Sequence, residues 1–579
     1  MRPYTLQYFY LQKPLTFLLC IAVISVLCWI GMGAFSTKGE PREASASVSI
    51  VEDGHWILPE VYAGEFAYKP PLMHWMTAVF SLPKGKVDLF TARLPSALSF
   101  IAMVGFCFLF FGRRVRFQQA FLACLIMITC FELHRAAMTS RVDMTLTALI
   151  VIGLIGLFNW EEKYSIKGFP WIATVILSGA ILVKGPVGAV LPLLVFGIYL
   201  LFLRYNFWKM AGKCLMVLLA ASILPAIWYY LAWQKGGGAF LDMVWAENFG
   251  RFFGGSVNIE YDLGHREAFG YNFLTLLTGF IPWTLLLLFS LFGLKSSLTM
   301  PTMPTVWSKV LALPKIQLFS LIAIIVIFIF YSIPISKRSV YLMPCYPFIA
   351  LFLAQYILYL CEYKNKVVKT FSWVISVLGS ITALLCLSSV ITHFISPEQW
   401  FAGEKIKMQV AGIWGALNGS ILLYLLLTII LLISLYILFV QIRKKNNLKI
   451  LYATIATYIA IFLVMDGIFF PAYKNSISVK PIAKELRNTY PDLTGNVYVM
   501  NNLKEYTNMY GLNFYLHNAF QNFETAQPDY GYLLIGHNSS RQAITQYEGQ
   551  YHFELLQTIE NKCRDGEREI LLFKVTAKH

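Results

Sequence analysis

The dominant pattern along the chain is a series of long apolar segments separated by short polar ones. A hydrocarbon core about 30 Å thick is crossed by a helix of about 20 apolar residues, and thirteen segments have this character. They lie near residues 15–35, 87–112, 117–133, 143–159, 169–183, 187–203, 211–233, 269–294, 315–334, 338–360, 370–393, 418–441 and 449–471. The sequence therefore predicts a polytopic α-helical membrane protein with about 13 transmembrane helices.

The charges between the segments predict an orientation. If the N-terminus is cytoplasmic, every loop on the cytoplasmic side contains Lys or Arg, such as Arg113 and Arg114 after the second segment or Arg443 and Lys444 after the twelfth. Short cytoplasmic loops carry this positive bias in membrane proteins. An odd number of spans then places the C-terminus on the outer side, where it is periplasmic in a bacterium with an outer membrane.

Three longer polar stretches lie outside in this topology: residues 36–86, residues 234–268 and the tail from about 472. The tail contains short apolar runs at 497–500, 532–535 and 569–575, which are typical of strands, and a helical pattern at 479–489. We therefore predict two domains. Residues 1–471 form the transmembrane domain with its outer loops 36–86 and 234–268, and residues 472–579 form a small α/β domain on the outer face.

The composition supports a membrane protein and excludes other classes of protein. The chain is 57% hydrophobic and 13% charged, with a mean hydropathy of +0.60, whereas soluble domains are about 45–50% apolar and about 25% charged. The net charge of +16 is explained by the basic loops, so we predict no nucleic-acid partner. Nine of the ten cysteines lie in or beside apolar segments, which excludes a disulfide scaffold.

Ionisable residues gather at the predicted outer ends of the spans. Such positions are costly unless the group is paired or faces water, so they mark functional sites. The candidate catalytic carboxylates are Glu40, Glu43 and Asp143, and the candidate substrate-binding residues are Lys69, Arg93, Lys184, Arg266, Lys337, Arg338 and Tyr341. Lys and Arg bind phosphate, and a carboxylate accepts a proton from an acceptor hydroxyl. The pattern indicates an outward-facing site for a membrane-bound phosphate.

Structural interpretations of the cations remain open at this point. Lys184, before Gly-Pro, is also explained by a lysine that extends along the helix to the interface. Lys337 and Arg338 are also explained by binding to outer lipid headgroups. Arg93 and the Arg141–Asp143 segment are also explained by structural ion pairs between helices.

The carboxylates and histidines have structural interpretations as well. Glu40 and Glu43 are also explained by solvation in a loop, and His265 by a hydrogen bond within its loop. We predict that His55 and His74 are structural residues.

The ordered set of motifs resembles a known family. Glu40-Pro-Arg-Glu43 is followed by Lys69-Pro-Pro-Leu, Arg93-Leu-Pro-Ser, Lys184-Gly-Pro and a Ser-Lys-Arg motif that leads to Tyr341. The order is similar to that of the lipid A aminoarabinose transferase family of GT-C membrane glycosyltransferases, which are related to the dolichyl-phosphate-mannose protein mannosyltransferases. The resemblance implies inverting sugar transfer from a polyprenyl-phosphate donor to a lipid A-like lipid or another envelope acceptor. It also implies a location in the bacterial inner membrane, among membrane lipids.

The resemblance also implies roles for individual residues. Lys69 and Tyr341 match family residues that contact the donor phosphate. Arg266 matches a phosphate-binding arginine, with Arg251 as a competing assignment. Asp143 matches an aspartate at the family's cavity.

Two departures from the family bear on the chemistry. Gly39 stands where the family has an aspartate, so Glu40 and Glu43 are the nearest carboxylates, and we expect Glu40 to be the base if the acceptor is a hydroxyl. His265 matches a metal-coordinating histidine, but Tyr68 replaces the glutamate that shares the metal. A single histidine does not hold a metal ion. We therefore predict no cofactor and keep a divalent metal at His265 as an alternative.

Other functions remain as alternatives. A transporter or flippase of lipid-linked sugars typically has internal repeats and polar groups near the middle of the bilayer, and neither pattern is found in the sequence. A protein O-glycosyltransferase of the same fold, a ligase with a pyrophosphate donor and a glycan-binding scaffold are further alternatives. The polar groups at one interface favour the glycosyltransferase.

Overall fold

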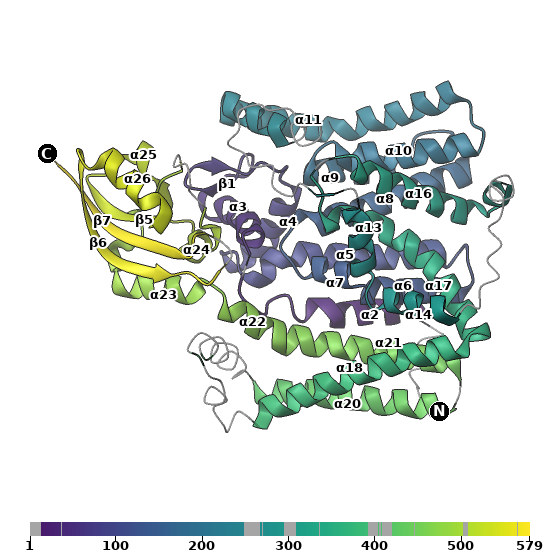
Figure 1. Cartoon of the computed structure of the whole chain (residues 1–579). Helices are drawn as coiled ribbons and strands as arrows, with labels where there is room; N and C mark the ends of the chain where they lie inside the picture. The colour runs from purple at the N-terminus through teal and green to yellow at the C-terminus, as the bar shows by residue number, and fades with distance from the viewer. Residues whose placement is uncertain are drawn as a thin grey trace. The chain divides into compact units, whose positions relative to one another are not determined.

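The computed structural model describes residues 13–35, 37–247, 267–268, 270–293, 308–334, 336–391, 403, 407, 420–444, 446–501, 508–563 and 566–578. The chain divides into two compact units (Figure 1). The helical unit comprises Met1–Trp29, Ser96–Leu387 and Leu425–Val464, and the mixed unit comprises Ile30–Pro95, Ser388–Tyr424 and Met465–His579. The first predicted outer loop and the tail thus belong to one unit. The predicted domain boundary near residue 471 stays a prediction.

The apolar segments form a set of helices, many of them packed side by side. The helices are α2 (Pro14–Ala22, continued by Val23–Leu27), α5 (Leu89–Phe111), α6 (Phe117–Thr129), α7 (Phe131–Ala137), α8 (Val142–Tyr164), α9 (Trp171–Lys184), α10 (Val187–Phe202), α11 (Phe207–Trp245), α13 (Tyr271–Gly279), α14 (Trp283–Gly293), α16 (Lys315–Ser332), η4 (Ser339–Cys345), α17 (Tyr346–Tyr363), α18 (Asn365–Ile391), α20 (Ile421–Lys444) and α21 (Asn447–Val464). Helices α8, α9 and α10 pack against one another, and α16 packs against α10. The rings of Phe158, Tyr199 and Phe319 meet between these helices.

Eight of the helices in the described part are long and apolar enough to cross a membrane, or ten if two bent pairs count as one span each. The bent pairs are α6 with α7, at 62°, and α13 with α14, at 100°. Three shorter apolar helices are Pro14–Leu27, Trp171–Lys184 and Val187–Phe202. Every predicted span falls on one of these helices or pairs, which confirms the polytopic α-helical fold. The number of thirteen crossings stays a prediction.

The first predicted outer loop is regular structure in the mixed unit. Helix α3 (Gly39–Asp53) ends at Gly54, whose φ of 72° is in the left-handed region that glycine adopts readily. A hairpin of β1 (Glu60–Tyr62) and β2 (Glu65–Phe66) follows, with positive φ at Ala63 and Gly64 in its turn. Helix α4 (Leu72–Ser81) and the short η2 (Leu82–Lys84) complete the segment.

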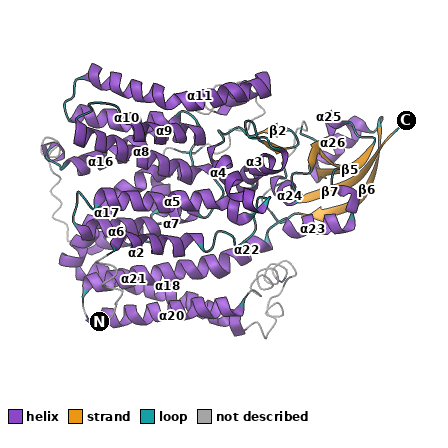
Figure 2. Cartoon of the chain, turned by 180° about the vertical axis from the view of Figure 1, so that it is seen from behind, coloured by secondary structure: helices purple, strands orange, loops and turns teal. Residues whose placement is uncertain are grey.

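The tail confirms the predicted α/β domain. Its strands are β3 (Val497–Val499), β4 (Phe520–Asn522), β5 (Tyr530–Gly536), β6 (Tyr551–Glu560) and β7 (Glu569–Ala577), in the order β4-β3-β5-β7-β6. Strand β3 is parallel to β4 and β5, and β7 is antiparallel to β5 and β6. The helices are α22 (Phe470–Ser476), α23 (Lys480–Thr489), α24 (Tyr510–Tyr515), α25 (Phe523–Ala526) and α26 (His537–Tyr547). Helices α23 to α26 are seen beside the strands in Figure 2.

The two faces of this sheet have separate cores, because successive side chains of a strand point to opposite faces. Val497 and Val499 belong to one buried cluster, and Tyr498 belongs to the other. The first cluster also contains Val61 and Tyr62 of strand β1, together with Ala46 of α3 and Ala67. The segment at the start of the chain and the sheet at its end therefore share one hydrophobic core.

Candidate active site

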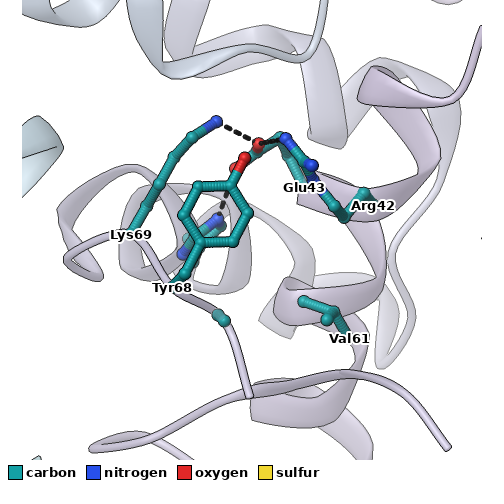
Figure 3. A pocket seen from close by; sticks show the side chains of 7 residues that line it. Arg42, Glu43, Val61, Tyr68 and Lys69 are labelled. Atoms are coloured by element: carbon teal, nitrogen blue, oxygen red, sulfur yellow. Dashed lines mark hydrogen bonds and ion pairs between the residues drawn. The ribbon is translucent and has the colours of Figure 1, made fainter. Parts of the chain in front are cut away.

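Five residues of the mixed unit, which we call the Glu43 cluster, bring opposite charges together: Arg42, Glu43, Tyr68, Lys69 and His74. Oε1 of Glu43 accepts hydrogen bonds from Lys69 Nζ and, at 3.2 Å, from Arg42 Nη2 (Figure 3). Its Oε2 accepts from His74 Nε2 at 3.0 Å. The Glu43 side chain is 4% exposed, and that of Lys69 is 12% exposed. One buried carboxylate is thus surrounded by three nitrogen donors.

The donors hold Glu43 in its ionised form. Burial by itself raises the pKa of Glu43, but the charge of Lys69, the hydrogen bond from His74 and the charge of Arg42 outweigh burial and hold this pKa well below its ordinary value. The pKa of Arg42 is raised: burial lowers it, and Tyr68 and Glu43 more than offset that effect. Two permanent cations and one carboxylate leave the cluster with an excess of positive charge.

This cluster lines a pocket together with Val61 and Ala67. The ring of Tyr68 lies between the two cations, with Arg42 Cζ at 4.7 Å and Lys69 Nζ at 5.3 Å from its centroid. The pocket is small, about 10 Å³, so a phosphate group enters it only when side chains of the cluster move, but the excess of positive charge there attracts such an anion. The pocket does not suit a divalent metal ion, because Tyr68 supplies no carboxylate beside Lys69 and the one carboxylate is already bound by cations.

One turn earlier on α3, Glu40 forms a different arrangement with Arg93. Arg93 Nε donates to Glu40 Oε1 at 2.8 Å, and Nη2 donates to Oε2 at 3.3 Å. Arg93 Nη1 also donates to three main-chain carbonyls, those of Ile30, Met32 and Gly33. The Arg93 side chain is 1% exposed. The structure therefore places these two predicted site residues in one buried ion pair that fixes the chain entering α3.

A second charged cluster lies in the helical unit, and we call Arg141, Asp143, Lys184 and Tyr341 the Asp143 cluster. Asp143 lies in the first turn of α8, where the helix dipole favours a negative charge. Lys184, the last residue of α9, donates to Asp143 Oδ1 at 2.5 Å, and Arg141 Nε lies 3.8 Å from Oδ2. Lys184 Nζ is also 4.3 Å from the centre of the Tyr341 ring. Three predicted site residues, Asp143, Lys184 and Tyr341, thus meet.

The structure adds two charged residues that the sequence analysis missed. Glu132, on α7, accepts from Arg135 Nη2 at 2.7 Å and from Ser339 Oγ at 2.8 Å. Ser339 begins η4, the turn that also carries Tyr341. A carboxylate and an arginine three residues apart inside an apolar segment are the signal that would have found this pair.

The remaining predicted residues are placed as follows. Lys337 is buried and donates to the main-chain carbonyl of Glu267 at 3.0 Å, while Arg338 is half-buried next to Ser339. Arg251, His265 and Arg266 lie outside the described residues. Within the described part of the chain, no group of three or more His, Cys, Asp or Glu residues is arranged to hold a metal ion.

The known proteins that the sequence resembles include sugar transferases. The family described as dolichyl-phosphate-mannose-protein mannosyltransferase matches residues 68–230. An undecaprenyl phosphate-alpha-4-amino-4-deoxy-L-arabinose arabinosyl transferase of Shewanella sediminis is 24% identical over 354 residues, which cover 59% of each chain. A second transferase of this name, from Proteus mirabilis, is 24% identical over 66% of each chain. The matches therefore span less than two thirds of these relatives.

The fold extends the likeness to nearly the whole chain. The crystal structure of ArnT from Cupriavidus metallidurans bound to undecaprenyl phosphate superimposes with a TM-score of 0.67, covering 96% of this chain and 97% of that one at 16% identity. The structure of the same protein in the apo state gives 0.66. The resemblance predicted from the sequence is confirmed: this multi-pass membrane protein is similar, in sequence and in fold, to the lipid A aminoarabinose transferase-like family of GT-C membrane glycosyltransferases.

Proposed function

We propose that the chain is a membrane glycosyltransferase that moves a sugar, with inversion, from a polyprenyl-phosphate donor to a lipid A-like lipid or another envelope acceptor. The reaction takes place at the outer face of the bacterial inner membrane. The observation that carries the proposal is the excess of cations around Glu43 in a pocket. The fold shared with a protein that binds undecaprenyl phosphate supports it.

The proposed chemistry assigns the cations to the leaving group. The acceptor oxygen attacks the anomeric carbon on the side opposite the donor phosphate, and the bond from that carbon to the phosphate oxygen breaks. The electron pair stays on the departing polyprenyl phosphate, so its negative charge grows in the transition state. Lys69 and Arg42 of the Glu43 cluster stabilise this charge when they turn from Glu43 to the phosphate, because a cation held beside the departing oxygen lowers the energy of the transition state. Lys184, Arg338 and Tyr341 of the helical unit stay proposed as substrate-binding residues.

The carboxylates receive separate roles. Glu40 is assigned a structural role, because Arg93 occupies both of its oxygens. Glu43 and Asp143 remain as the proposed catalytic carboxylates. The pKa of Glu43 lies well below its ordinary range, so Glu43 is a weak base while Lys69 is bound to it. It becomes a stronger base when Lys69 turns to the donor phosphate. An acceptor phosphate is already ionised and needs no base, whereas a hydroxyl does.

The transfer reaction itself is the test. Purified protein in detergent receives undecaprenyl phosphate carrying a radiolabelled sugar together with extracted envelope lipids. We expect label in an acceptor, and a rate about 100-fold lower for Lys69→Ala, as for the loss of one group that stabilises transition-state charge. Lys84→Ala is the matched control, because Lys84 is 50% exposed and pairs with Asp88. Movement of label across a vesicle membrane without a new glycosidic bond would establish the transporter instead.

The orientation is part of the proposal. The N-terminus is cytoplasmic, and the domain of residues 472–579 is periplasmic. A reporter that is active only in the periplasm is expected to be active when fused after Lys578 and inactive when fused after Lys444, the last residue of α20. The opposite pattern would contradict the proposed location of the site.

A further inference from the structure

A short segment near the end of the chain is bound to the hairpin near its start. Asn508 Nδ2 donates to Glu65 Oε2 at 3.2 Å, and the Tyr510 hydroxyl lies 3.4 Å from the same oxygen and donates to it. Asn513 Nδ2 donates to the main-chain carbonyl of Val61 at 3.3 Å. We call residues 508–518 the clamp segment, because both strands of the hairpin are attached to it.

The clamp segment is also attached to helix α3. Asn518 Nδ2 donates to the main-chain carbonyl of Ser45 at 2.9 Å. Asn518 has a φ of 52°, a left-handed conformation that Asn adopts more readily than most residues. A further bond reaches the hairpin again: the main-chain N–H of Met509 donates to the hydroxyl of Tyr62, on strand β1, at 3.3 Å. These partners are 443 to 473 positions apart in the sequence.

Apolar and aromatic contacts reinforce the attachment. The ring of Tyr510 lies 5.1 Å from that of Tyr62, edge to face, and the ring of Phe514 lies 5.0 Å from that of Phe35. Tyr510 and Leu512 belong to the core that the hairpin shares with the C-terminal sheet. The clamp segment is therefore packed as well as hydrogen-bonded.

The attached elements carry the Glu43 cluster. Ser45 follows Glu43 by two residues on α3, and Glu65 precedes Lys69 by four residues at the end of the hairpin. One segment thus contacts both of the elements whose spacing sets the positions of Arg42 and Lys69.

We infer that the clamp segment positions the Glu43 cluster for binding of the donor phosphate, so that the C-terminal domain is a working part of the site. The inference rests on the proposed function for the identity of the ligand. A charged group stabilises a phosphate only when it is held within narrow limits of distance. Residues that hold the backbone segments carrying such groups therefore affect phosphate binding. Asn508, Tyr510 and Asn518 are positioning residues, because they act through Arg42 and Lys69.

The test measures binding of undecaprenyl phosphate to the purified full-length protein. Each of Tyr510→Phe and Asn518→Gly removes two hydrogen bonds, one within the clamp segment and one to the hairpin or to α3. We expect each variant to weaken binding about 5-fold, which is the size of the one lost bond that attaches the clamp segment. Glycine keeps the left-handed backbone of position 518 and removes only the amide. The matched control is Tyr530→Phe, since Tyr530 is half-exposed on β5 and its hydroxyl bonds to Tyr532; it is expected to bind as the unaltered protein does.

A second comparison separates positioning from general stability. In the Lys69→Ala background, Tyr510→Phe is expected to weaken binding less than 2-fold further, because Tyr510 bonds to Glu65 on the hairpin that leads to Lys69, and the group through which it acts is then absent. Unchanged affinity in Tyr510→Phe and Asn518→Gly, an equal effect in both backgrounds, or an equal effect of Tyr530→Phe would each overturn the inference. Binding of undecaprenyl phosphate without sugar transfer to any acceptor would overturn the proposed transferase alone. Absence of binding by the unaltered protein would overturn both.

Discussion

Two carboxylates on helix α3, one turn apart, have opposite surroundings. Glu40 meets one guanidinium in a buried pair, and Nη1 of the same guanidinium donates to three main-chain carbonyls. Glu43 meets Lys69, Arg42 and His74 beside a pocket, and the charges there do not cancel. A balanced, saturated pair holds the fold together, whereas an unbalanced cluster is able to attract a ligand. The sequence motif alone shows two glutamates of the same kind.

The largest expected effect that tests this difference is the loss of Arg93. Arg93→Met leaves Glu40 buried without its counter-charge, so we expect the free energy of unfolding to fall by about 3–5 kcal/mol. Denaturation in detergent monitors the change. The double variant Glu40→Leu with Arg93→Met is expected to regain most of this loss, because an apolar pair needs no partner charge. Equal stability of the single and double variants would contradict the structural role.

Replacing each glutamate by glutamine sharpens the comparison. Glu43→Gln removes the negative charge from a cluster with excess cations, so we expect undecaprenyl phosphate to bind about 5-fold more tightly, a change of about 1 kcal/mol. Glu40→Gln is expected to lower stability and to leave phosphate affinity within 2-fold. The measurement is isothermal titration calorimetry of undecaprenyl phosphate binding to each variant. Equal affinities of the two variants would contradict the difference between Glu40 and Glu43.

A smaller effect is expected on acid stability. The pKa of Glu43 is depressed in the folded protein, so its contribution to stability is present above the ordinary glutamate pKa and is lost as the pH falls below that value. The unfolding temperature of the unaltered protein is therefore expected to fall more between about pH 5 and about pH 2 than that of Glu43→Gln. Parallel curves for the two proteins would show that Glu43 is not held by the cations.

The smallest effect is expected at an exposed pair. Lys84 and Asp88 lie four residues apart and are 50% and 34% exposed. Lys84→Ala is expected to change the free energy of unfolding by less than about 0.5 kcal/mol and to leave transfer activity unchanged. A loss of stability as large as that of Arg93→Met would contradict the expectation that an exposed ion pair contributes less than the buried pair of Glu40 and Arg93.

The membrane-spanning pattern was predictable because apolar length and loop charge are local properties of the chain. The helical fold and the strands of the tail follow from such patterns. The structure of residues 36–86 was not predicted, since its helix and hairpin are stabilised by apolar residues of the tail.

The candidate site was predicted in part. The charged residues were recognised because charges at membrane interfaces are unusual, but pairing depends on partners far along the chain. Arg93 is 53 positions from Glu40, and His74 is 31 positions from Glu43. His74 was predicted to be structural, which stays a prediction; its Nε2 donates to the central carboxylate of the cluster. Glu132 was not predicted, because its contact with Ser339 joins residues 207 positions apart.

The attachment of residues 45–65 to residues 508–518 has a consequence for biosynthesis. A ribosome that adds about 5–20 residues per second needs roughly 20–90 s to reach the clamp segment after the hairpin has emerged. During this time the apolar faces of α3 and the hairpin have no partner from the tail. Contacts over such separations also close slowly, since the loop entropy is lost before they form. Assembly of this region therefore waits for the last hundred residues, and a truncated chain presents an unfinished early segment to quality-control proteases.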